Sequence, residues 1–338
     1  TSLFATDWYV DQMKRKAYES EPIPSQLTHE LYRYGNRDVI YLQKITDNRW
    51  NISDFMNWIG SDRPETKLRY YLEKNGADLS EYPESTLELV YYPTDKIRVP
   101  VNKENVLKSG LVKEKDSALI VDYIDIDLPG ALAKNRILML DILANNDWER
   151  PIYFSGGSFD NAEYLWMKEY LQLDGMAYKL VPIRTTNRSP FEMGRIDSDL
   201  MYDIVMEWDW GNSGSSEIYH DPQTRSQGLS LRSNLARLVE TLISENKIEK
   251  ARDIIGLAMT NMKVEHYDFY TFVEPFVDGY YKVGETSRAR ELFNQLRDIY
   301  QGRLEYYSGT PLDQQYSQME EIFSDMEAYR RIIDIAIE

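Results

Sequence analysis

The chain has 338 residues, enough for two domains, and its 42% hydrophobic and 28% charged content is typical of a folded globular protein. A formal net charge of −17 would repel a phosphate backbone, which excludes sequence-independent binding of nucleic acid. The absence of cysteine excludes disulfides and thiolate metal sites, and the three histidines are too widely spaced to predict a histidine-rich zinc site.

The first 130 residues predict short helices and strands in alternation. The chain enters an amphipathic segment at Trp8 without a leader sequence, and no apolar run approaches the roughly 20 residues that span a bilayer, so we expect a water-exposed segment of a longer protein. The expected elements are a helix over 8–18, a strand over 39–42, a helix opened by Ser53 or Asp54, a helical segment over 66–72, extended chain over 87–101, a short helix over 102–110 and a strand over 118–127.

The stretch from Lys134 to Ile183 predicts an α/β fold. Its apolar residues over 137–143 favour a buried helix, and residues 151–154 favour a short buried strand. A Gly-containing turn, a helix ending at Leu171 and a second strand over 177–183 follow. This order is typical of βαβ units, and we therefore expect a three-layer α/β domain over residues 1–212.

The C-terminal third predicts helices only. A helix over 198–208 precedes a Gly- and Ser-rich segment, which we interpret as a linker over 213–228. The domain expected over 229–338 contains an internal repeat, in which Ala251 and Arg252 correspond to Ala289 and Arg290 at an offset of 38 residues. Small residues at such positions allow paired helices to approach closely, so we expect a tetratricopeptide-like repeat domain, with a plain helical bundle as the alternative. Its expected helices cover 229–244, 248–262, 266–283 and 287–307.

The Gly-containing turn is one candidate ligand site. Ser155, Gly156, Gly157 and Ser158 follow a predicted strand and precede a predicted helix, so their amides could hold a phosphate or sugar oxygen at the start of that helix. The stretch matches neither common nucleotide-binding pattern, and an ordinary tight turn is the alternative.

Two further candidates are acidic and aromatic. Asp125 and Asp127 share one face of a predicted strand, where both carboxylates could meet one divalent cation; an exposed acidic strand end is the alternative. Trp208 and Trp210 could form a ligand-binding patch or pack between domains, and we favour packing. None of the three histidines lies in a recognisable catalytic context, so we predict no catalytic residue and no cofactor for this chain.

Six stretches resemble one family of large multi-pass membrane proteins, over most of Thr6 to Asn212. They are TDWYVDQMKRKAYES from Thr6, PSQLTHELYRYGNRDVIY from Pro24, VPVNKENVLKSG from Val99, LDILANNDWERPIYFSGG from Leu140, YLQLDGMAYKLVPI from Tyr170 and GRIDSDLMYDIVMEWDWGN from Gly194. Together they resemble the C-terminal soluble region of the protein O-mannosyltransferase-like family of Bacteroidetes type, long catalogued as a domain of unknown function.

The resemblance implies a non-catalytic role for this chain. In such proteins a bundle of membrane helices is expected to carry the transfer chemistry with a lipid-linked sugar donor, and no catalytic residue can be transferred to the present sequence. The resemblance also implies a further strand upstream of Thr6, so that the sheet here would have an exposed edge.

The implied function is that of a periplasmic domain, on the extracytoplasmic face of the inner membrane, which binds an acceptor polypeptide or is positioned over the membrane active site. The parent would contact the membrane through helices outside this sequence. The alternatives are a stand-alone interaction module unrelated to sugars and, less favoured, a soluble metal-dependent sugar transferase that uses Asp125 and Asp127.

Overall fold

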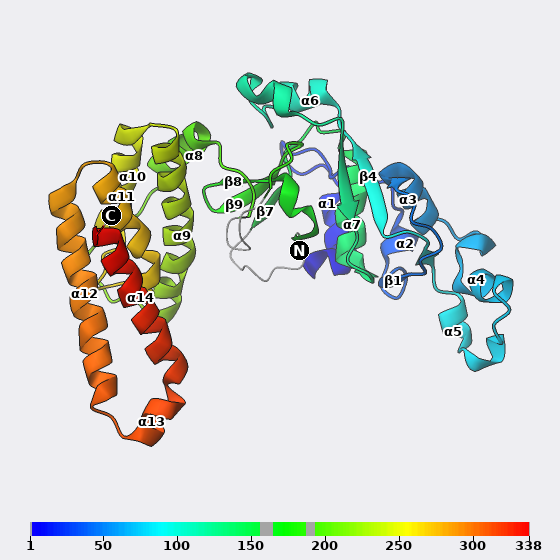
Figure 1. Ribbon diagram of the computed structural model, residues 1–338. Coiled ribbons are helices and arrows are strands. Elements are labelled where there is room, and N and C mark those ends of the chain that lie inside the picture. The colour runs from blue at the N-terminus through cyan, green and yellow to red at the C-terminus, as the bar shows by residue number, and fades with distance from the viewer. Residues whose placement is uncertain (1, 156–164, 187–192, 338) are drawn as a thin grey trace. The chain divides into compact units, whose positions relative to one another are not determined.

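The computed structural model describes residues 2–155, 165–186 and 193–337 (Figure 1). Its strands are β1 Val39–Leu42, β2 Trp50–Asn51, β3 Tyr91–Tyr92, β4 Lys96–Pro100, β5 Tyr123–Asp127, β6 Leu132–Ala133, β7 Tyr153–Ser155, β8 Leu171–Asp174 and β9 Ala177–Leu180. Its helices are α1 Asp7–Met13, α2 His29–Tyr32, α3 Ile52–Ile59, α4 Leu68–Lys74, α5 Glu84–Leu87, α6 Lys103–Lys108, α7 Lys134–Asn145, α8 Ser198–Met206, α9 Pro222–Ser244, α10 Ile248–Asn261, α11 Glu274–Lys282, α12 Thr286–Ser308, α13 Leu312–Ser317 and α14 Met319–Ile337.

These elements form two compact units. Among the described residues, the α/β unit comprises 2–154, 165–171, 179–186 and 193–194, and the helical unit comprises 155, 172–178 and 195–337. The described part therefore confirms the predicted order, a mixed α/β region with small sheets followed by an all-helical region. The expected domain limits of 1–212, 213–228 and 229–338 stay a prediction.

Two three-stranded sheets lie within the α/β unit. In the first, β1 pairs in parallel with β3 and antiparallel with β6. In the second, β4 pairs in parallel with β2 and antiparallel with β5, in a register that sets Ile97 opposite Ile126 and Val99 opposite Ile124. All four of these side chains are buried, as period-two alternation requires of a strand with one face on the core.

The helices α3 and α7 pack against each other in the core of this unit. Phe55, Met56 and Ile59 form the buried face of α3, and Asn51 caps this helix by accepting a hydrogen bond from the amide of Ser53. The expected caps, Ser53 and Asp54, lie in the first turn of the helix instead. Leu138 and Leu140 of α7 are fully buried, as the apolar run over 137–143 predicts.

The third sheet has the strand order β7-β9-β8. Two expectations are corrected, one at β8 of this sheet and one at β5 of the second sheet. The expected helix ending at Leu171 is instead a 3-10 helix, Leu165–Tyr170, followed by strand β8. The alternation of leucine with polar residues in Leu171–Asp174 favours a strand over a helix. The strand expected over 118–127 begins only at Tyr123, because residues 114–119 form a 3-10 helix.

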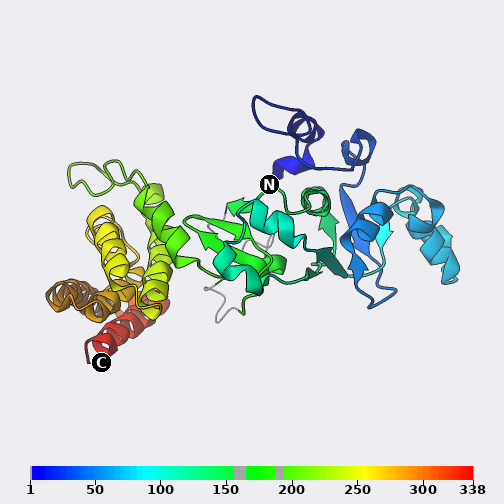
Figure 2. The ribbon, with the colours of Figure 1, turned by 90° about the horizontal axis from the view of Figure 1, so that it is seen from above.

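Besides the short helices α8 and α13, the described part of the helical unit contains two helix pairs and a following long helix. The pairs are α9 with α10 and α11 with α12, and α14 packs on both α11 and α12 (Figures 1 and 2). Ala251 of α10 and Ala289 of α12, the residues that the internal repeat aligns, are both fully buried. The helix α9 begins at Pro222, capped by Asp221, and so extends into the segment interpreted as a linker. The sequence patterns did not indicate α13 or α14.

Candidate functional site

The two acidic candidates of β5 are held by arginines. The guanidinium of Arg98 contacts Asp125 through two hydrogen bonds, Nε to Oδ1 at 2.8 Å and Nη2 to Oδ2 at 2.9 Å. Arg49 lies 3.4 Å from Asp125 and donates to Asp127 at 3.0 Å. The hydrogen bonds from Arg98 hold the pKa of Asp125 below its usual range despite partial burial. A cation at this strand end would have to displace both arginines, and no cluster of three metal-ligating residues is present in the described ranges.

Ser155 is the last residue of β7. Gly156, Gly157 and Ser158 lie outside the described residues, so ligand binding at this turn stays a prediction.

The two tryptophans lie in the helical unit beside the β8–β9 turn. Their ring centroids are 5.6 Å apart in an edge-to-face arrangement. Trp208 covers Gly175, where an added Cβ would lie 2.9 Å from the ring, and the carbonyl of Gly175 accepts a hydrogen bond from Asn234 of α9. Trp208 thus packs the turn against helices of the same unit. A ligand-binding role for Trp208 and Trp210 stays a prediction.

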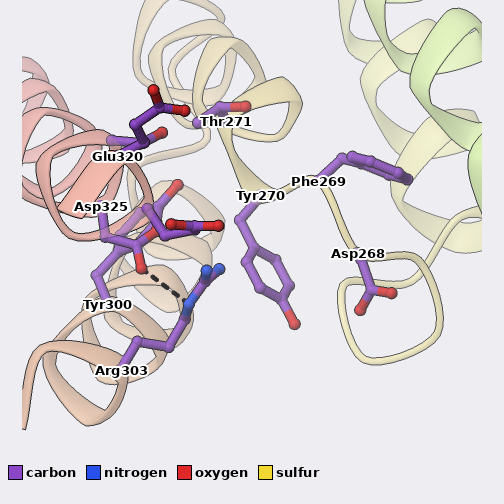
Figure 3. A pocket seen from close by; sticks show the side chains of 10 residues that line it. Asp268, Phe269, Tyr270, Thr271, Tyr300, Arg303, Glu320 and Asp325 are labelled. Carbon is purple, nitrogen blue, oxygen red and sulfur yellow. Dashed lines mark ion pairs between the residues drawn. The ribbon is translucent and has the colours of Figure 1, made fainter. Parts of the chain in front are cut away.

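A pocket of about 680 Å³ lies in the helical unit, at a place that the sequence patterns did not indicate (Figure 3). Three segments far apart in sequence form it: the loop that precedes α11, the second half of α12 and the first half of α14. The lining residues are Asp268, Phe269, Tyr270, Thr271, Tyr300, Arg303, Glu320, Glu321, Ser324 and Asp325.

The buried guanidinium of Arg232 in α9 holds the loop that forms one wall. It donates hydrogen bonds to the backbone carbonyls of Met262, Lys263, Tyr267 and Asp268, at 2.9, 3.3, 3.0 and 2.6 Å. Burial lowers the pKa of Arg232 to about 10. The loop then turns at Phe269, which has a left-handed backbone (φ 62°) and a partly exposed ring. Four fixed carbonyls therefore place Phe269 and Tyr270 at the pocket.

The sequence contains one signal that the residues of this wall form a loop and not a helix. The helix expected over 266–283 is wrong over its first half, since α11 begins at Glu274 and only 270–272 forms a 3-10 turn. Pro275 occupies the first turn of α11, where proline is favoured because the amide there has no helical partner. A reading that started the helix at Pro275 would have left the aromatic run over 267–272 in a loop.

A network of polar groups lies next to the pocket, around the buried carboxylate of Glu274 and the lining residue Tyr300. The hydroxyl of Tyr300 donates to Glu274 at 3.0 Å, and Nε of Arg331 donates to the other carboxylate oxygen at 2.8 Å. Burial raises the pKa of Glu274, which Arg331 and Tyr300 partly oppose. Beside them Nε of Arg303 lies 2.9 Å from Asp325 (Figure 3). The ring of Tyr270 meets Tyr300 edge-on at 6.4 Å.

The pocket has an excess of negative charge. Asp325 is neutralised by Arg303, and Asp268 by Arg225 at 2.8 Å. Glu320 and Glu321 form no ion pair within the described ranges, so two negative charges remain. Aromatic faces next to free carboxylates favour a cationic group such as a lysine or arginine side chain. The arrangement can bind such a group, and it offers no nucleophile paired with a base among the lining residues.

Fold and pocket together define a class: an α/β unit joined to paired helices that carry an acidic, aromatic binding pocket. In the part of the chain that the structure covers, no helix has the length and apolar character needed to cross a membrane.

Comparison with protein families then identifies the chain further. The family model for TMEM260-associated domain 2 matches residues 1–200, more than half of the chain, and the chain therefore belongs to this family. The domain is linked to TMEM260, a protein O-mannosyltransferase-like family, which agrees with the resemblance found in the sequence. No curated protein and no solved structure matches the chain. The match ends within α8, so the helices that form the pocket follow it.

Proposed function

We propose that this chain is a non-catalytic accessory domain of a TMEM260-like membrane glycosyltransferase, and that its helical unit binds the acceptor polypeptide. The domain would lie on the periplasmic face of the inner membrane, and the membrane-embedded part of the protein would carry the transfer chemistry. Family membership supports the link to TMEM260, and the pocket supports the binding role.

The charge and shape of the pocket carry this proposal. A volume of about 680 Å³ accommodates one or two side chains of an extended segment rather than a whole domain. The two free carboxylates, Glu320 and Glu321, and the exposed edge of Phe269 favour a segment that presents lysine or arginine. The acceptor would therefore be a polypeptide whose modified region has basic residues nearby.

Peptide binding to the whole chain tests the proposal. A fluorescent peptide of about nine residues, rich in serine and threonine and with two arginines, is titrated with the 338-residue chain and its anisotropy measured. A second peptide carries glutamate in place of both arginines. We expect binding of the arginine peptide only, weakened about tenfold by Glu320→Gln with Glu321→Gln because two attractive charges are removed.

The matched control is Glu104→Gln with Glu114→Gln, which removes the same charge from exposed positions of the α/β unit. Binding that falls equally in the control, or equal binding of both peptides, would contradict a specific pocket. Transfer of sugar to the peptide by the isolated chain with Mg²⁺ or Mn²⁺ would overturn the non-catalytic role and return attention to Asp125 and Asp127.

A further inference from the structure

The helix α14 carries an exposed apolar ridge, which consists of Met319, Phe323 and Met326. Their side chains are 40%, 58% and 51% exposed. Because an α-helix turns 100° per residue, the spacings of four and three place the three residues within about 60° of one another. A continuous apolar strip of this kind on a folded protein marks an interaction surface more often than scattered apolar residues do.

The ridge lies away from the rest of the helical unit. The buried residues of α14 are Asp325, Ala328 and Ile332, and they face α11 and α12. The helical rotation places them nearly opposite the ridge. Glu321, Ser324 and Asp325 of the pocket also lie on this buried side, whereas Glu320, which lines the pocket as well, lies between the two sides. The ridge and the pocket are therefore neighbouring surfaces that meet at Glu320.

The repeat architecture shows what kind of element the ridge fits. The helix α14 follows the second pair in the chain, packs along α12 and also contacts α11. The first helices of the two complete pairs are each covered by a second helix. The first half of α14 instead exposes an apolar outer face, which a further amphipathic helix would cover.

A row of acidic residues along one flank of the ridge favours a docked helix with positive charge on the flank that meets it. Glu320, Glu327 and Asp334 follow one another at intervals of seven residues and are all exposed. Arg330 pairs with Glu327 at 3.0 Å and with Asp334 at 2.9 Å, which leaves a net charge of −2 along the row. In an antiparallel pair of two α14 helices the same flank of each would meet, so the acidic rows would repel. The acidic row thus disfavours the α14 helix of a second copy as the occupant of the ridge and favours a helix with a basic flank.

We propose that the ridge of α14 docks an amphipathic helix of a partner polypeptide, with apolar residues at spacings of three and four and with lysine or arginine along the flank that meets Glu320, Glu327 and Asp334. The three apolar residues of the ridge do not line the pocket, so substituting them tests this proposal apart from the acceptor-binding role of the pocket.

A designed helix serves as the probe. The first peptide has about 21 residues, with leucine at heptad positions a and d and lysine at e and g, and in the second peptide glutamate replaces every lysine. Isothermal titration of the 338-residue chain should detect binding of the lysine peptide and none of the glutamate peptide. Phe323→Ser with Met326→Ser should weaken that binding by about tenfold or more, because the apolar anchors of the interface are lost.

The matched control is Tyr219→Ser, which removes an 82% exposed aromatic ring from a loop of the same unit and should leave binding unchanged. Thermal melting followed by circular dichroism confirms that both variants are folded, which is expected since all three side chains are exposed. Equal binding of the two peptides, unchanged binding by the Phe323/Met326 variant, or no binding at all would overturn the proposal. Sedimentation that shows self-association of the chain, abolished by Phe323→Ser, would also overturn it in favour of a second copy.

Discussion

The buried carboxylate of Asp141 holds the segment around Ser25 against helix α7 by hydrogen bonds. Asp141 lies inside the apolar helix α7 and is fully buried. It accepts hydrogen bonds from the hydroxyl of Ser25, from the amides of Gln26 and Leu27 at 3.2 and 3.4 Å, and from the side chain of Asn145 at 3.0 Å. Its place in the apolar run of 137–143 is therefore explained by donors that lie more than a hundred residues earlier.

Replacing this carboxylate should destabilise the α/β unit. Asp141→Ala leaves several buried donors without an acceptor, and we expect the free energy of unfolding to fall by about 3 kcal/mol. Urea denaturation followed by circular dichroism measures the change. The control is Asp122→Ala, which removes only an exposed ion pair with Lys103 and should lower the free energy of unfolding by less than about 0.5 kcal/mol. Equal losses would show that the buried network contributes nothing.

Glu274, which accepts a hydrogen bond from the lining residue Tyr300, should make stability depend on pH. Burial raises its folded-state pKa above the ordinary value of 4.5, so the folded chain holds the proton more tightly than the unfolded chain. Its contribution to stability is therefore fully present below the unfolded pKa and is lost as the pH rises through the folded pKa.

The variant Glu274→Gln lacks this titration and keeps an acceptor for Tyr300. The stability difference between variant and native chain should therefore shift in favour of glutamine as the pH rises from below the ordinary value of 4.5 through the raised folded-state pKa. Urea unfolding at a series of pH values gives the difference directly. A difference that stays constant over this range would show that Glu274 does not titrate differently in the folded state.

At the scale of elements, the β8–β9 turn depends on a glycine that nothing larger can replace. Gly175 has φ +67°, and an added Cβ would lie 2.9 Å from Trp208 and 3.3 Å from Ile204. Gly284, between α11 and α12, has φ +82° and nothing within 4 Å. Both alanine variants suffer backbone strain, but only one of them meets a neighbouring side chain.

We expect Gly284→Ala to lower the free energy of unfolding by about 1 kcal/mol and Gly175→Ala by about 1–3 kcal/mol more. The difference between the two variants isolates the packing of Trp208 on the turn. Thermal or urea unfolding of the helical unit, monitored by tryptophan fluorescence, measures it. Equal losses would mean that Trp208 simply moves aside.

How far the sequence predicts the elements depends on where their signals lie. Local signals were sufficient for β1, for the short helix α6 within 102–110 and for the repeated alanines at 251 and 289. The start of α9 was missed because the cap at Asp221 lies in a Gly- and Ser-rich context. The pocket could not be predicted, because residues 268–271, 300–303 and 320–325 meet only through the packing of α12 and α14.

At the scale of the whole molecule, the two units should unfold separately. Asp141 lies in the α/β unit, and the contacts described for it stay within that unit. In hydrogen exchange followed by mass spectrometry, Asp141→Ala should lower protection in 2–154 and leave the amides of α9–α12 unchanged. Equal loss of protection in both sets of amides would show instead that the chain unfolds as one cooperative body.

The boundary between the units has a consequence for how such proteins can evolve. Residues 172–178, the tip of the β8–β9 hairpin, fold with the helical unit although the residues on either side belong to the α/β unit. The carbonyl of Gly175 accepts a hydrogen bond from the side chain of Asn234, and the ring of Trp208 packs on the same turn. A recombination event that transferred only the coding region for 195–338 would remove the carbonyl that accepts from Asn234 and the turn on which Trp208 packs. We therefore expect that a functional transfer of the helical repeats between genes must include the tip of the hairpin.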